Sequence, residues 1–102
     1  MPYNVDFESM PWEEPQAGVR SKATRFGTKQ LRLVEYTDQM EPHWCEKSHA
    51  GCILEGRMEI TFERTVVEFG TGDGVVIPRG PRHRHMARVV AGPVLAMFVE
   101  DA

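Results

Sequence analysis

All four histidines of this 102-residue chain lie in two short segments whose side chains could bind a metal ion together. The first segment, Pro42–Gly56, has the sequence PHWCEKSHAGCILEG, and the second, Gly72–His85, has the sequence GDGVVIPRGPRHRH. Imidazole and thiolate groups suit Zn, Fe, Cu and Ni far better than Mg or Ca. The two segments therefore predict a transition-metal site if the fold brings them side by side.

The spacing of these residues fits strands that point several ligands at one place. His43 and Cys45 are two residues apart, as are His83 and His85, and His49 has the same parity as His43. Residues two apart share one face of a β-strand, so each pair would point to one side. Two neighbouring strands would then direct several imidazoles, and a thiolate, to a common point.

The segments that must position these side chains have the patterns of β-strands. Apolar and polar residues alternate over short stretches, Gly- and Pro-rich turns separate the stretches, and no window has a helical period. Gly56 is expected to end one strand, and a turn is expected at 91–93. The expected strands are 19–26, 29–37, 52–56, a hairpin over 57–69 that turns near Glu63, 75–78, 82–90 and 94–100.

This pattern predicts a single all-β domain, a jelly roll in which two antiparallel sheets close into a barrel. The length suffices for one hydrophobic core and not for two. We expect the barrel to span residues 18–102. Residues 1–17, rich in proline and aromatic side chains, are expected to form an irregular arm that packs on the barrel or on a partner subunit.

The two segments resemble the two sequence motifs of the cupin superfamily. The first family motif is HxHxxxE followed by a glycine, and the second is G-D, a spacer and PxGxxH. The resemblance covers the chain from about residue 28 to residue 100 and implies the cupin fold, a double-stranded β-helix. A weaker likeness, from Trp12 to the LRLVEY strand, is to the cupin domains of zinc-binding anti-sigma factors. The matching positions are His43, Cys45, His49 and Gly56 in the first motif, and Gly72, Asp73, Pro78, Gly80 and His83 in the second.

The resemblance implies a ligand set of His43, His49 and His83. Cys45 replaces the second histidine of the family motif and is a candidate fourth ligand, with a small buried apolar role as the alternative. His49 replaces the family's glutamate, and losing that carboxylate favours Zn, Ni, Fe or Cu over Mn. His85 could substitute for His83, could hydrogen-bond a ligand without binding the metal, or could be a hydrogen-bonded core imidazole. A barrel without a native metal is the remaining alternative.

The resemblance implies two classes of function that the sequence does not separate. One is an enzyme, an isomerase, epimerase, lyase or dioxygenase, that acts on a small polar metabolite such as a sugar acid or a thiol. The other is a non-catalytic module that senses a metal or a ligand, or serves a structural purpose. Three protein ligands are typical of a catalytic metal and four of a structural one. Glu35 is a candidate buried acid or base.

Composition and charge give expectations about partners. The net charge of −3 argues against nucleic acid as a partner, and the cluster of arginines at positions 79–88 is expected to be a solvated face. No apolar run approaches the ~20 residues that span a bilayer, so we expect no membrane partner. Unpaired strand edges and the arm favour a homodimer.

The expected compartment is the cytoplasm. The N-terminal residues lack the basic and apolar regions of a secretory signal. The two cysteines, Cys45 and Cys52, are too few for a disulfide scaffold and are expected to stay reduced.

Overall fold

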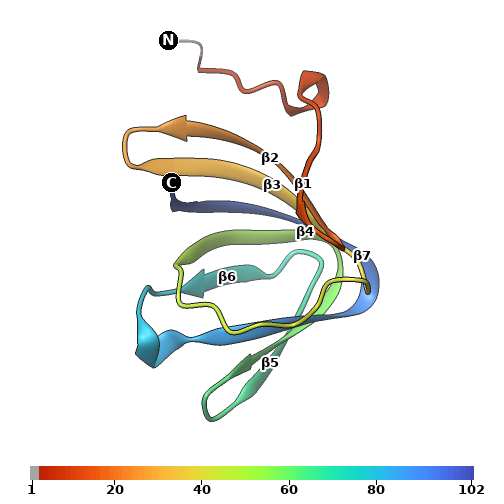
Figure 1. Ribbon diagram of the computed structural model, residues 1–102, viewed down its shortest axis with the longest axis vertical. Helices are drawn as coiled ribbons and strands as arrows, with labels where there is room; N and C mark the ends of the chain where they lie inside the picture. The colour runs from red at the N-terminus through yellow and green to blue at the C-terminus, as the bar shows by residue number, and fades with distance from the viewer. Residues whose placement is uncertain (1–2) are drawn as a thin grey trace.

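The computed structural model describes residues 3–102, most of which lie in β-strands (Figure 1). The predicted all-β jelly roll is confirmed. Two short 3-10 helices, η1 (Phe7–Ser9) and η2 (Pro81–His83), interrupt the β structure. None of the described helices is long and apolar enough to cross a membrane. The strands are β1 (Glu13–Gln16), β2 (Val19–Phe26), β3 (Lys29–Tyr36), β4 (His49–Phe62), β5 (Val66–Gly70), β6 (Gly74–Ile77) and β7 (His85–Asp101).

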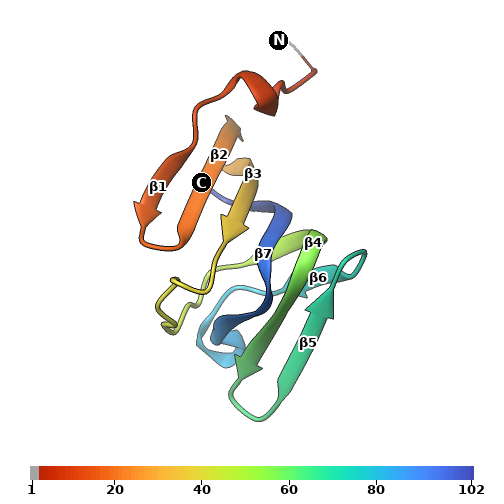
Figure 2. The same cartoon turned by 90° about the vertical axis from the view of Figure 1, so that its right-hand side faces the viewer.

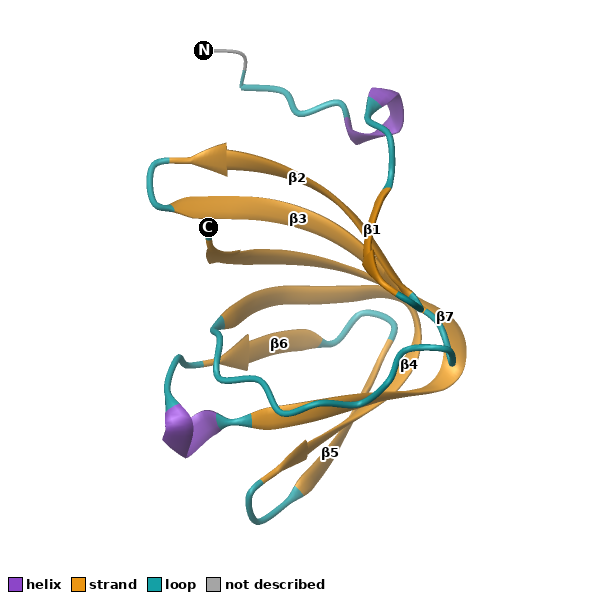
Figure 3. Cartoon of the chain, in the orientation of Figure 1, coloured by secondary structure: helices purple, strands orange, loops and turns teal. Residues whose placement is uncertain are grey.

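Two long strands, β4 and β7, hold the barrel together because each contributes to both of its sides. The strand order is β1-β2-β3-β7-β4-β5, with β6 paired to β4, and every pair is antiparallel. Residues 94–101 of β7 pair with β3, whereas residues 85–91 pair with the second half of β4. The two sides therefore face each other, as Figures 2 and 3 show from two directions.

The structure differs from the predicted strand limits where β4 and β7 bend. Gly56 does not end a strand, and residues 91–93 do not separate two strands. The register between β4 and β7 shifts between Ile53 and Met58, so both strands continue through the bend. Gly56 has a φ of 85° and lies against the backbone of residues 91–94. Glycine is needed there because a side chain would collide with the neighbouring strand.

We expect Gly56→Ala to destabilise the protein clearly more than Gly72→Ala. Both glycines have positive φ, 85° and 91°, so both alanines carry backbone strain, at about 1–3 kcal/mol. A Cβ at Gly56 would also lie 2.5 Å from the Pro93 carbonyl oxygen, whereas a Cβ at Gly72 meets nothing within 4 Å. Urea unfolding of both variants measures the difference. Equal losses would contradict the close approach of the two strands.

The hydrophobic core fills the space between the two sides of the barrel. Alternate residues of each strand point inward, as Val94, Ala96 and Phe98 do on β7. The only buried polar residues in the described part of the chain are His85 and Glu100, and both lie on β7. The buried apolar residues are Val19, Val34, Ile53, Met58, Ile60, Val75, Ile77, Val94, Ala96 and Phe98.

The N-terminal segment is less irregular than predicted, because Glu13–Gln16 forms strand β1 and pairs with β2. The Trp12 ring lies under the side chains of Arg20 and Lys22, at 4.4 and 4.6 Å from its centroid. The Lys22 ammonium also donates a hydrogen bond to the Phe7 carbonyl at 2.7 Å. This segment therefore packs on its own sheet. Residues 1 and 2 of the predicted arm lie outside the described residues.

Candidate metal centre

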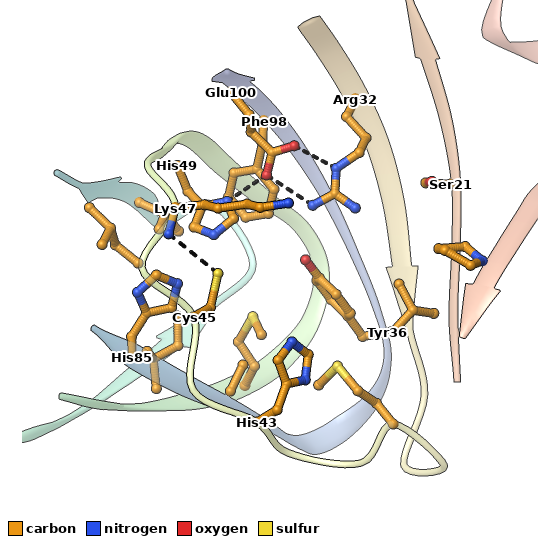
Figure 4. A pocket seen from close by; sticks show the side chains of 18 of the residues that line it. Ser21, Arg32, Tyr36, His43, Cys45, Lys47, His49, His85, Phe98 and Glu100 are labelled. Carbon is orange, nitrogen blue, oxygen red and sulfur yellow. Dashed lines mark hydrogen bonds and ion pairs between the residues drawn. The ribbon is translucent and has the colours of Figure 1, made fainter. Parts of the chain in front are cut away.

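One end of the barrel contains a pocket of about 430 Å³ with apolar and polar walls (Figure 4). Met58, Ile60 and Phe98 belong to its apolar lining. A pocket of this size suits one small molecule. Its polar lining includes Arg32, Tyr36, Cys45, Lys47, His49, His85 and Glu100.

Cys45, His49 and His85 form a cluster in this pocket that could hold a metal ion. One ligand atom from each lies within 4.8 Å of the other two. His49 begins β4 and His85 begins β7, and their rings lie 5.0 Å apart. Cys45 belongs to the loop before β4, and two backbone hydrogen bonds with His85, at 2.8 and 2.9 Å, hold it there. Three separate segments thus meet at one point.

Hydrogen bonds fix the orientation of both imidazoles. His85 Nδ1 lies 3.0 Å from the His83 carbonyl oxygen, and His49 Nδ1 lies 2.5 Å from Glu100 Oε2. A carbonyl or a carboxylate oxygen can only accept, so both Nδ1 atoms carry the proton. In the neutral form of each ring, the lone pair is then on Nε2. A histidine that donates Nδ1–H to an oxygen and offers Nε2 is the usual state of a metal ligand.

The environment of His85 favours its neutral, metal-binding form. Burial lowers the pKa of His85, and the hydrogen bond with the His83 carbonyl opposes that effect. The Cys45 sulfur accepts a hydrogen bond of 3.5 Å from the backbone N–H of Lys47. The two imidazoles and the thiol therefore fit the needs of a borderline or soft divalent metal.

Glu100 is a buried acid that holds His49 in place and is itself held by Arg32. Arg32 Nε and Nη2 donate to its two oxygens at 2.6 and 2.9 Å. Burial alone would raise the pKa of Glu100, but the hydrogen bonds from His49 and Arg32 outweigh it and lower the pKa to about 2. Glu100 is thus charged at neutral pH and completes a carboxylate–histidine pair beside the cluster.

The structure differs from the predicted ligand set at His43 and His83. His83 lies in η2, is exposed, and lines a separate shallow pocket with residues 62–65. The 3-10 turn over residues 81–83 delays the strand alternation until His85, so His85 and not His83 points inward. His83 contributes only its carbonyl oxygen. His43 lines the main pocket but is exposed and is not one of the clustered ligands. Cys45 and His49 do belong to the cluster.

Sequence reasoning missed both Glu100 and Arg32. The pattern carried a signal for both: Glu100 has the parity of the inward-facing Phe98, and Arg32 has the parity of the buried Val34. Charged residues on the buried faces of two strands imply an ion pair between them. Glu35, the acid chosen from the sequence, lies outside the pocket in an ion pair with Arg20 at 2.8 Å. Both cysteines are free thiols.

Known structures share this fold over nearly the whole chain. KdgF from Halomonas sp. is 18% identical, with 92% of this chain and 89% of that chain aligned and a TM-score of 0.75. A protein of unknown function from Rhizobium leguminosarum bv. viciae is 15% identical, with 99% and 97% aligned and a TM-score of 0.79. An RmlC-like cupin from Shewanella frigidimarina is 16% identical, with 100% and 93% aligned and a TM-score of 0.77.

The sequence itself was compared with family models and with curated proteins. No curated protein matches it. The family model described as "Cupin domain" matches residues 32–100, which is more than half of the chain. The match includes both histidine segments and every residue of the cluster. This chain therefore belongs to the cupin domain family.

Proposed function

We propose that this cupin binds one divalent transition metal through Cys45, His49 and His85. The observation that carries the proposal is the arrangement of the two imidazoles, each with Nδ1 engaged by an oxygen and with its Nε2 left for a metal. The thiol beside them adds a soft ligand. This donor set favours Zn, Ni, Fe or Cu over Mn.

The proposed role of the site is to bind or act on a small polar metabolite. A bound divalent metal would supply Lewis acidity toward an oxygen of that metabolite. The protein would supply three ligands, fewer than the four of a closed structural site, and a pocket of about 430 Å³ beside them. These two features favour a ligand-binding or catalytic site over a purely structural one. Glu100 and the His83 carbonyl would keep the two imidazoles in position.

A non-catalytic sensing module is the second candidate, and Cys45 is the observation that favours it. A thiolate ligand makes metal binding sensitive to oxidation of the sulfur. The two candidates differ in turnover: a sensor would bind metal and metabolite without converting the metabolite. The proposed compartment in either case is the cytoplasm, where Cys45 and Cys52 would stay reduced.

We also propose that the chain forms a homodimer through the outer face of β6, β4, β7 and β3. The strand register places Val76, Ala50, Val99 and Leu31 in one row across β6, β4, β7 and β3. The exposed fraction is 82% for Val76 and 38% for Val99. An apolar row across four strands is typical of a surface that a second subunit covers. Sedimentation analysis would detect the dimer.

The metal proposal is tested by comparing Cys45→Ser with Cys52→Ser. Protein purified without a metal-affinity column is loaded with Zn(II) or Co(II), and bound metal is counted by elemental analysis. We expect about one equivalent in the wild type and in Cys52→Ser, because Cys52 is not in the cluster. Cys45→Ser should bind the metal on the order of 100-fold more weakly. Losing a residue that only hydrogen-bonds a ligand costs up to about that factor, and losing the ligand itself should cost at least as much.

The Co(II) form adds a direct view of the sulfur. Thiolate-to-cobalt charge-transfer absorption should appear in the wild type and in Cys52→Ser and be absent from Cys45→Ser. Failure of the wild type to take up Zn, Ni, Fe or Cu would overturn the metal proposal. Metal uptake that is unchanged in Cys45→Ser would remove Cys45 from the ligand set.

A further inference from the structure

We propose that the metabolite is a small organic acid whose carboxylate is held by Lys47, Tyr36 and Arg32. This inference rests on the proposed function and names the substrate class of the same pocket. The three residues line the pocket together with the cluster. In Figure 4, the Lys47 side chain extends across the pocket from the Cys45 loop, while Arg32 and Tyr36 enter from β3.

The hydrogen-bond acceptors deep in the pocket already have donors. Glu100 is the buried carboxylate of the pocket, with a side chain that is only 7% exposed. Its oxygens accept from Arg32 at 2.6 and 2.9 Å, from His49 at 2.5 Å and from Gln30 at 3.4 Å. A ligand therefore finds no free carboxylate at this depth to receive a donor.

Hydrogen-bond donors in the same pocket remain unused. A guanidinium has five N–H groups, and the hydrogen bonds to Glu100 use one from Nε and one from Nη2 of Arg32. Burial raises the pKa of Tyr36, although Arg32 opposes this, so its hydroxyl keeps the proton that it can donate. Lys47 has no acidic partner within 4.0 Å in the described part of the chain. The unused polar capacity is that of donors, and among them only Lys47 is a cation without an acidic partner in the described part of the chain.

Two other acids border the pocket and do not change this balance. The Asp101 carboxylate pairs with Lys29 at 2.6 Å and with Arg79 at 3.6 Å, so its charge is compensated from outside the pocket. Glu41 is exposed. Neither pairs with Lys47 in the described residues. An anionic group of a ligand would therefore fit the unused donors on the β3 side of the pocket.

The remaining surface limits the size and character of the ligand. Met58, Ile60 and Phe98 supply apolar walls, and the cluster supplies the place for a second oxygen of the ligand. A compact acid with a hydroxyl or keto oxygen near its carboxylate matches both. A long acyl chain or a bare inorganic ion would leave one of these features unused.

The test measures binding of named acids and their uncharged counterparts by calorimetry. The probes are lactate, malate and gluconate, the corresponding amides, and inorganic phosphate, each with Zn-loaded and with metal-free protein. The variants are Lys47→Gln and Tyr36→Phe, neither of which removes a side chain of the cluster, and Lys47→Gln keeps the backbone N–H that donates to the Cys45 sulfur. Arg25→Gln is the matched control, because it removes one positive charge from an exposed side chain of β2 that does not line the pocket.

We expect at least one acid to bind the Zn-loaded protein at least about tenfold more tightly than its amide, because a charge-assisted hydrogen bond is lost in the amide. Lys47→Gln and Tyr36→Phe should each weaken the binding of that acid by about tenfold, and Arg25→Gln should leave it unchanged. All three variants should keep one equivalent of zinc, so a failure of this inference is distinguishable from a failure of the metal site.

Three outcomes would overturn the inference. Amides that bind as tightly as the acids would show that the charge is not recognised. Acids that bind Lys47→Gln and Tyr36→Phe as tightly as they bind the wild type would place the carboxylate elsewhere. Binding of phosphate alone, or of none of the probes, would exclude a small carboxylate as the ligand class.

Discussion

Glu100→Gln is expected to lower the free energy of unfolding of the metal-free protein by about 3–5 kcal/mol. The glutamate side chain is 7% exposed and the Arg32 side chain that it pairs with is 17% exposed. Removing the carboxylate leaves a largely buried guanidinium without its counter-charge, which costs much more than the pair itself contributes. Urea unfolding followed by tryptophan fluorescence measures the loss.

Glu35→Gln is the matched control for this substitution. It removes the same charge from a bidentate arginine pair, but the Arg20 side chain is 44% exposed and Glu35 lies outside the pocket. An exposed pair contributes about 0–1 kcal/mol, so the expected loss is small. A further variant, Arg32→Met with Glu100→Gln, should recover part of the stability that Glu100→Gln loses. Equal losses in Glu35→Gln and Glu100→Gln would contradict the burial of the Arg32–Glu100 pair.

The same carboxylate should make the stability of the metal-free protein depend on pH in the acid range. The folded-state pKa of about 2 lies below the ordinary value of 4.5, so the folded state favours the charged form. Its contribution is complete above about pH 4.5 and is lost as the pH falls toward 2. The fall from 4.5 to about 2 corresponds to about 3 kcal/mol. In Glu100→Gln this part of the acid dependence should be missing.

His85→Ala is expected to weaken metal binding on the order of 100-fold or more, whereas His83→Ala should leave it nearly unchanged. His85 is 4% exposed and belongs to the cluster, while the His83 side chain is exposed and lies at the shallow pocket. His83→Ala keeps the backbone carbonyl that accepts the Nδ1 proton of His85. Equilibrium dialysis with Zn(II) compares the two variants.

The two histidines make this comparison sharp because they are close in sequence and matched in chemistry. An equal loss of zinc affinity in both variants would mean that residues 81–85 affect metal binding by stabilising the turn and not by supplying one ligand. A loss in His83→Ala alone would restore the ligand set that the motif spacing favours. Circular dichroism of both metal-free variants checks that they remain folded.

The fold could be predicted from the sequence because it depends on turns and on alternation. Gly72, Asp73, Pro78 and Gly80 marked the turns between short strands, and the motif spacing identified the barrel. The bends at Gly56 and at residues 91–93 were harder to predict. A glycine or proline inside a long strand has the same local pattern as a turn, and only the pairing of β4 with β7 distinguishes the two cases.

The site could be predicted as a region but not as a set of atoms. The two segments do meet in one pocket, and Cys45 and His49 lie there as parity suggested. The exchange of His83 for His85 depends on a 3-10 turn of three residues, which shifts the start of the strand alternation. Glu100 comes from the last strand, 51 residues after His49, so no local motif could have joined them.

The most direct test of the central claim is X-ray absorption spectroscopy of the Zn-loaded wild type. The predicted nearest shell contains one sulfur at about 2.3 Å and two imidazole nitrogens at about 2.0–2.1 Å. Cys45→Ser should lose the sulfur contribution and Cys52→Ser should keep it. A shell of nitrogen and oxygen alone in the wild type would contradict the assignment of Cys45, His49 and His85 as the metal ligands.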